Sequence, residues 1–90
     1  MTRTSRDVLI TNRRGLHARA SAKFVTLASG LSCEVEVRKD DGSVTGTSIM
    51  GLMMLGAAKG DSIRISAEGD GAAGAVDAMA ALVEGKFGED

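Results

Sequence analysis

The only histidine of the 90-residue chain is His17, which lies in the segment NRRGLHARASAKF at residues 12–24. Arg19 follows it by two positions and Arg14 precedes it by three. A neutral imidazole is a nucleophile towards phosphorus, and the planar guanidinium group of arginine binds phosphate oxygens in pairs. These residue types at this spacing predict a histidine that accepts a phosphoryl group. A surface histidine that only caps a helix is the alternative that the spacing leaves open.

The residues after His17 predict a helix whose first turn faces this site. Its small and apolar residues recur at helical spacing at Ser21, Phe24, Val25 and Ala28, and Gly30 predicts its end. A helix that begins near Ala18 leaves several backbone N–H groups unpaired, and the helix dipole adds positive potential there. We therefore expect Ala18 and Arg19 to bind the phosphate.

The remaining elements follow from hydrophobic periodicity. Strands are predicted at residues 6–11, 33–38, 43–47 and 62–68, and further helices at 49–55 and through Ala72, Val76, Met79, Ala80 and Val83. The Asp-Gly pair at 41–42 predicts a hairpin turn. Elements in this order, each with one apolar face, predict a two-layer α+β sandwich. Its sheet is expected to be mainly antiparallel, with its outer face in water.

The segment SIMGLMML, residues 48–55, predicts a helix capped by Ser48. Its apolar residues are too many for one face of so short a helix, so some of them are expected at the surface. Exposed methionines adapt to several partners. We expect Ile49, Met50 and Met53 to form a docking surface, whereas a plain helix cap is the alternative for Ser48.

Composition excludes several other classes of protein. The net charge of −1 and the two aromatic residues argue against a nucleic-acid-binding surface. A single cysteine, Cys33, forms neither an internal disulfide nor a zinc cluster, and the cytoplasm is the expected compartment. No apolar run predicts a membrane span or a signal peptide. We expect one domain over residues 1–90, with no metal and no cofactor.

The segment GLHARASAKFV, residues 15–25, resembles the active-site segment of HPr, the histidine phosphocarrier of the bacterial phosphotransferase system, with its pattern Gly-Leu/Met-His-X-Arg-Pro-Ala. TSIMGLMMLG at 47–56 resembles the family's regulatory-serine segment, and GDSIRISAEG at 60–69 its last strand. The likeness covers about 80 of the 90 residues. It implies an open-faced sandwich of βαββαβα order, with a four-stranded sheet and three helices on one face.

The resemblance also implies roles for single residues. His17 would accept a phosphoryl group on Nδ1 from phosphorylated enzyme I, itself charged from phosphoenolpyruvate, and would pass it to an enzyme IIA-type acceptor. Arg19 would hold the phosphate oxygens. Ser48 would be a site of regulatory phosphorylation by a dedicated kinase, HPr kinase/phosphorylase, and its phosphate would weaken transfer to His17 by placing charge in the docking surface.

One residue departs from the family pattern. Ala20 stands where the family has the proline that follows arginine. Alanine is an excellent helix former, so the helix is expected to persist, and the departure bears on the rigidity of the loop and the rate of transfer. Gly15 is expected to let the loop approach its neighbours closely.

These observations favour a phosphocarrier, which is a protein substrate of two transfer reactions rather than a self-contained catalyst. The sequence leaves open both a sugar-uptake carrier and a nitrogen-type regulatory carrier. The second is an alternative because the asparagine of TNRRGLHAR is associated with that branch. An HPr-like docking module without phosphotransfer is a further alternative, and a small RNA-binding domain lacks the required basic and aromatic surface. A carrier that exposes one face to successive partners is expected to be a monomer without membrane insertion.

Overall fold

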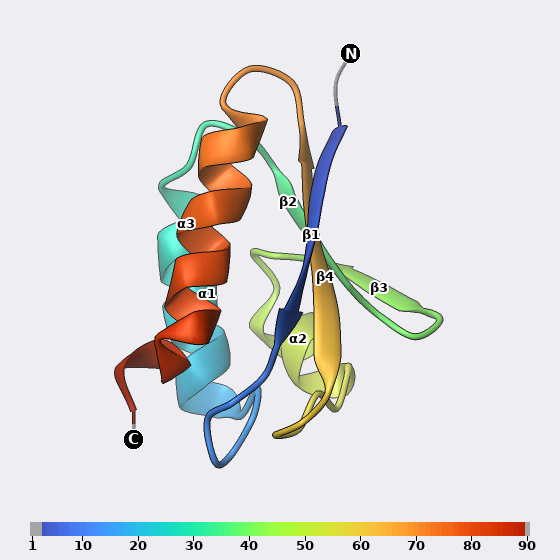
Figure 1. Ribbon diagram of the computed structural model, residues 1–90, viewed down its shortest axis with the longest axis vertical. Helices are drawn as coiled ribbons and strands as arrows, with labels where there is room; N and C mark the ends of the chain where they lie inside the picture. Colours follow the sequence, from blue (N-terminus) through green and yellow to red (C-terminus); the bar gives the residue numbers. More distant parts are fainter. Residues whose placement is uncertain (1–2, 90) are drawn as a thin grey trace.

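The computed structural model describes residues 3–89, and its elements follow the predicted order (Figure 1). They are β1 (Arg3–Leu9), α1 (Ala18–Ser29), β2 (Val35–Lys39), β3 (Gly42–Thr45), α2 (Ile49–Met54), β4 (Ser62–Glu68), α3 (Ala72–Glu84) and the 3₁₀ turn η1 (Lys86–Gly88). The α+β class with four strands and three helices is confirmed, whereas η1 was not predicted.

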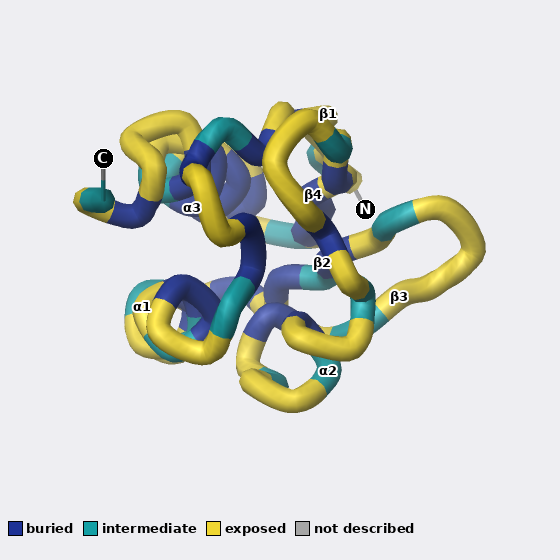
Figure 2. The backbone as a smooth tube through the Cα atoms, turned by 90° about the horizontal axis from the view of Figure 1, so that it is seen from below, coloured by how far each residue is buried: buried dark blue, intermediate teal, exposed yellow. Residues whose placement is uncertain are grey.

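The sheet has the strand order β1-β4-β2-β3, and all three strand pairs are antiparallel. β2 and β3 form the predicted hairpin, in which Lys39 pairs with Gly42 across a turn at Asp40 and Asp41. β4 lies between β1 and β2. Helices cover one face of this sheet, as the view from below shows (Figure 2). The result is the open-faced sandwich that the resemblance implied.

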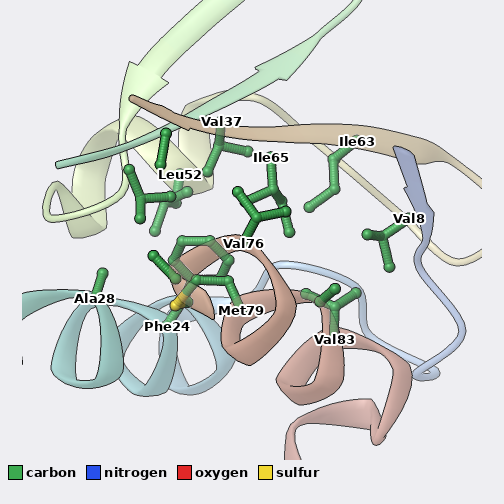
Figure 3. Close-up of a cluster of buried hydrophobic side chains, with 14 of the residues drawn as sticks. Val8, Phe24, Ala28, Val37, Leu52, Ile63, Ile65, Val76, Met79 and Val83 are labelled. Atoms are coloured by element: carbon green, nitrogen blue, oxygen red, sulfur yellow. The ribbon is translucent and has the colours of Figure 1, made fainter. Parts of the chain in front are cut away.

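The core lies between the sheet and the helices, and it follows from alternation along the strands. Val37 and Ile65 project from the sheet towards Phe24 of α1 and Met79 of α3 (Figure 3). All four side chains are fully buried, whereas Arg64, which precedes Ile65, is exposed on the outer face. The predicted stripes of α1 and α3 are buried as expected, with only Val25 half-buried.

Several boundaries differ from those predicted. β1 begins at Arg3 and ends at Leu9 rather than spanning 6–11, and β2 begins at Val35 rather than 33. Hydrophobicity marks the buried residues alone, whereas a strand extends as far as its backbone finds a partner, and Arg3 still pairs with Glu68. Cys33 is nevertheless buried, and its Sγ donates a hydrogen bond to the carbonyl oxygen of Asp70 at 2.8 Å.

The longest helix of the described chain is α3, with 13 residues. Among residues 3–89, no helix combines the length and the apolar character that crossing a membrane requires. Within the same range, histidine, cysteine and acidic side chains nowhere gather in a group of three or more that could hold a metal ion.

Candidate active site

The loop between β1 and α1 is pressed against the chain that follows α2. The backbone N–H of Leu16 donates to the carbonyl oxygen of Ala57 at 3.0 Å. Gly15 adopts φ +64°, and a Cβ atom built on it would lie 2.3 Å from the same oxygen. Only glycine fits so close an approach in a left-handed conformation. The expectation for Gly15 is thus confirmed, and its cause is the contact with Ala57.

His17 is the N-cap residue of α1, with an extended backbone at φ −74° and ψ 179°. Its Nδ1 accepts a hydrogen bond from the backbone N–H of Arg19 at 3.2 Å. The ring therefore takes the place that a capping serine or aspartate would have, and satisfies one of the otherwise unpaired amides of the first turn. The side chain is 22 % exposed, so it is reachable from solvent although partly covered.

Three arginines surround this ring. Arg13, Arg14 and Arg19 line a pocket of about 270 Å³ together with His17 and Glu89. All three are exposed, and within residues 3–89 none of them pairs with a carboxylate, in contrast to the arginines at positions 3, 6 and 64. Their positive charge, added to the amides at the start of α1, is free to bind an anion. The structure thus places Arg19 in the same pocket as His17, and Ala18 is the first residue of α1, directly after the ring.

Glu89 is a member of the site that sequence reasoning missed. Its Oε2 lies 2.5 Å from Nε2 of His17, and its Oε1 accepts a hydrogen bond from Nδ2 of Asn12 at 3.1 Å. Asn12 is fully buried and donates a second bond to the carbonyl oxygen of Gly15 at 2.8 Å. The isolated aromatic residue of the KFGE tail, Phe87, was the one available signal, because a buried anchor there fixes the position of residue 89.

The charge of Glu89 follows from its partners. Burial alone would raise the pKa of its carboxyl group, but hydrogen bonds from Asn12 and His17 and the electrostatic attraction of His17 and Lys23 outweigh this and lower the pKa. Glu89 is therefore an ionised carboxylate near neutral pH.

The two neighbours of the ring assign its proton. Nδ1 faces a donor, the N–H of Arg19, whereas Nε2 faces an acceptor, the carboxylate of Glu89. A neutral imidazole with its hydrogen on Nε2 satisfies both contacts, and its lone pair then resides on Nδ1. The arrangement therefore places the Nδ1 lone pair at the positive end of α1.

Comparisons with known proteins agree with this geometry. The family described as "PTS HPr component phosphorylation site" matches residues 4–85. The phosphocarrier protein HPr of Neisseria meningitidis serogroup B is 51 % identical over 83 residues, which cover 92 % of this chain and 93 % of the relative. The chain belongs to the HPr family. The crystal structure of an HPr from Thermoanaerobacter tengcongensis superposes with a TM-score of 0.88 at 43 % identity, covering 100 % and 99 % of the two chains.

A phosphocarrier with another name is also similar. The phosphocarrier protein NPr of Shewanella violacea is 39 % identical over 89 residues, covering 99 % of this chain and 98 % of the relative. This HPr-family chain therefore has relatives of both names, and its place in the phosphotransferase system is that of a phosphocarrier.

The segment around α2 lies beside the loop that leads into α1 (Figure 1). The helix α2 packs against α1, and Ala57, whose carbonyl oxygen accepts the hydrogen bond from Leu16, follows α2 in the chain. Ser48 caps α2, and its Oγ accepts a hydrogen bond from the N–H of Gly51 at 3.0 Å. Exposed side chains of α2 are Ile49 at 40 %, Met50 at 68 %, Met53 at 40 % and Met54 at 80 %. The prediction that apolar residues remain at the surface is confirmed. We call Ile49, Met50 and Met53 the α2 patch.

Proposed function

We propose that His17 is the phosphoryl carrier of this chain, that it accepts the group from phosphorylated enzyme I, and that it passes the group to an enzyme IIA-type acceptor. The observation that supports this proposal is the placement of the Nδ1 lone pair of His17 at the start of α1, next to arginines without carboxylate partners in residues 3–89. Membership of the HPr family supports the same role.

The chemistry is a direct displacement at phosphorus. Nδ1 donates its lone pair to phosphorus while the bond between phosphorus and the donor atom breaks, and the donor keeps that electron pair. Once Nδ1 bonds to phosphorus it no longer accepts from the N–H of Arg19, which then becomes available to a phosphate oxygen. Ala18 contributes a backbone amide of the same turn, and the guanidinium of Arg19 a bidentate contact.

Transfer onward requires that the phosphate is held without being enclosed. A ring that is about one-fifth exposed at a helix end meets this need, because a partner can approach the phosphorus in line. The chain is therefore a substrate of two transfer reactions, and the α2 patch is the proposed docking surface for both partners. We further propose that a kinase of the HPr kinase/phosphorylase type phosphorylates Ser48, which would place charge at the edge of this patch. The monomeric state and the single domain over residues 1–90 stay predictions.

The test is incubation of the chain with enzyme I and phosphoenolpyruvate carrying labelled phosphate. We expect an acid-labile, base-stable label on the wild type and none on His17→Ala. Circular dichroism of His17→Ala checks that the fold persists, and Ser48→Ala is the matched control that keeps the label. A label of the same stability on His17→Ala would contradict the assignment of His17. An unlabelled wild type would contradict the proposed function and favour the alternative of an HPr-like docking module without phosphotransfer.

The nitrogen-type branch is a second candidate because an NPr relative matches almost the whole chain. Comparing the rates of phosphorylation by enzyme I of the sugar branch and of the nitrogen branch distinguishes the two. The faster donor identifies the branch.

A further inference from the structure

The chain after α3 takes an unusual path towards the histidine. Lys86, Phe87 and Gly88 have φ values of +59°, +56° and +77°. A residue with a side chain loses about 1–2 kcal/mol in the left-handed region, and a bulky residue there is rare. Two such residues in succession need contacts that hold them in place.

Two contacts supply this restraint. The side chain of Phe87 is 1 % exposed within the core, and its carbonyl oxygen accepts a hydrogen bond from Nζ of Lys23 at 2.7 Å. The turn is thus anchored from inside by an aromatic ring and from outside by an ammonium group. Glu89 comes directly after this turn, so the strained segment has the effect of fixing one carboxylate against the ring of His17.

The carboxylate is fixed at both of its oxygens. Oε1 accepts from Nδ2 of Asn12, and Oε2 lies against Nε2 of His17. Asn12 cannot turn its amide without losing the bond to Gly15 as well, so its donor stays aimed at Glu89. The other charged side chains that line the pocket are the cations Arg13, Arg14 and Arg19. Glu89 is the one carboxylate among those lining residues.

We propose that Glu89 is a positioning residue for phosphotransfer, which keeps the ring proton on Nε2 of His17 and so keeps the lone pair on Nδ1. This inference rests on the proposed function of His17. Nδ1 and Nε2 lie on opposite edges of the ring, so the carboxylate does not cover the nucleophile. When Nδ1 forms its bond to phosphorus, the proton stays on Nε2 and the ring gains positive charge, which the adjacent carboxylate stabilises. When the phosphoryl group leaves, the electron pair of the N–P bond returns to Nδ1 and the ring is neutral again.

The test compares Glu89→Gln with the matched control Glu84→Gln, which also removes one carboxylate near the end of the chain but on the exposed side of α3, next to Arg6. The ¹⁵N chemical shifts of the His17 ring report which nitrogen carries the proton, without any phosphotransfer. The initial rate of phosphorylation by phosphorylated enzyme I is the second measurement.

We expect the wild type and Glu84→Gln to show the neutral ring protonated on Nε2. In Glu89→Gln we expect a mixture of both tautomers and a rate several-fold lower, because fewer rings carry the lone pair on Nδ1 and the positive charge of the phosphorylated ring loses its carboxylate. Unchanged ¹⁵N shifts in Glu89→Gln would overturn the proposal, and so would changed shifts with an unchanged rate. A wild type that accepts no phosphoryl group refutes the proposed function instead, and the ¹⁵N shifts would still decide whether Glu89 sets the tautomer.

Discussion

At Gly15, a single added methyl group has no space. A Cβ atom there would lie 2.3 Å from the carbonyl oxygen of Ala57 and 2.8 Å from the Cα of Ala58, and both neighbours are backbone atoms that cannot turn aside. The position of His17 two residues later depends on this contact, because the loop bonds to the same oxygen through Leu16. The glycine of the motif thus serves the placement of the ring.

We predict that Gly15→Ala lowers the free energy of unfolding by about 2–4 kcal/mol, through backbone strain and overpacking together. Gly56→Ala is a matched control, since Gly56 has φ +66° but no atom within 4 Å of its built Cβ. It should lose only about 1–2 kcal/mol, from the left-handed backbone alone. Urea denaturation measures both changes. Equal losses in the two variants would contradict the role assigned to the contact with Ala57.

Among the secondary-structure elements, η1 combines a fully buried ring with a strained backbone. Phe87→Ala removes the anchor of this turn. We predict a loss of about 3–5 kcal/mol in the free energy of unfolding, as for other buried phenylalanines. This is a large part of the roughly 5–15 kcal/mol that is typical of a small domain. Denaturant unfolding measures the loss, and a value below about 1 kcal/mol would show that the ring is not a core residue.

The conservative variant Phe87→Leu separates packing from position. Leucine keeps most of the apolar volume, so we expect a loss of about 1.5 kcal/mol or less and an intact turn. The ¹⁵N shifts of the His17 ring should therefore stay close to those of the wild type in Phe87→Leu and change in Phe87→Ala, because Glu89 follows the anchor.

At the scale of the whole molecule, charge is unevenly distributed. The chain has a net charge of −1, yet three arginines without carboxylate partners in residues 3–89 gather around His17. A local positive field of this kind would steer an acidic partner surface to the site, and the nearby α2 patch is the apolar surface that we propose for docking.

We predict that negative charge in or beside the α2 patch slows phosphorylation of His17 by phosphorylated enzyme I. Met50→Glu and Ser48→Asp should each lower the initial rate several-fold to about tenfold while leaving the thermal midpoint nearly unchanged. Ala73→Glu is the matched control, since it adds the same charge at an exposed residue in the first turn of α3. Rates equal to that of Ala73→Glu would contradict docking at this patch.

The sequence predicted those parts of the site that depend on local signals. His17 and the start of α1 adjoin in the chain, as do Ser48 and α2, and period-two alternation sets the inward face of β2 and β4. Glu89 was not predicted as a site residue because its contact with His17 spans 72 residues. The path that closes this distance runs through left-handed Lys86 and Phe87, which no periodicity or residue preference indicates. The ends of β1 and β2 were not predicted correctly for a related reason, because they depend on backbone pairing with β4.

The position of Glu89 against the histidine has a practical consequence for work on this chain. An affinity tag of histidines introduced directly behind Glu89 would bring extra imidazoles and charge close to the carboxylate that contacts the His17 ring. β1 begins at the opposite end of the molecule from the start of α1, which His17 caps (Figure 1). Purification handles and spectroscopic labels therefore belong ahead of β1, and kinetic data from proteins tagged behind Glu89 should be compared with those of the untagged protein.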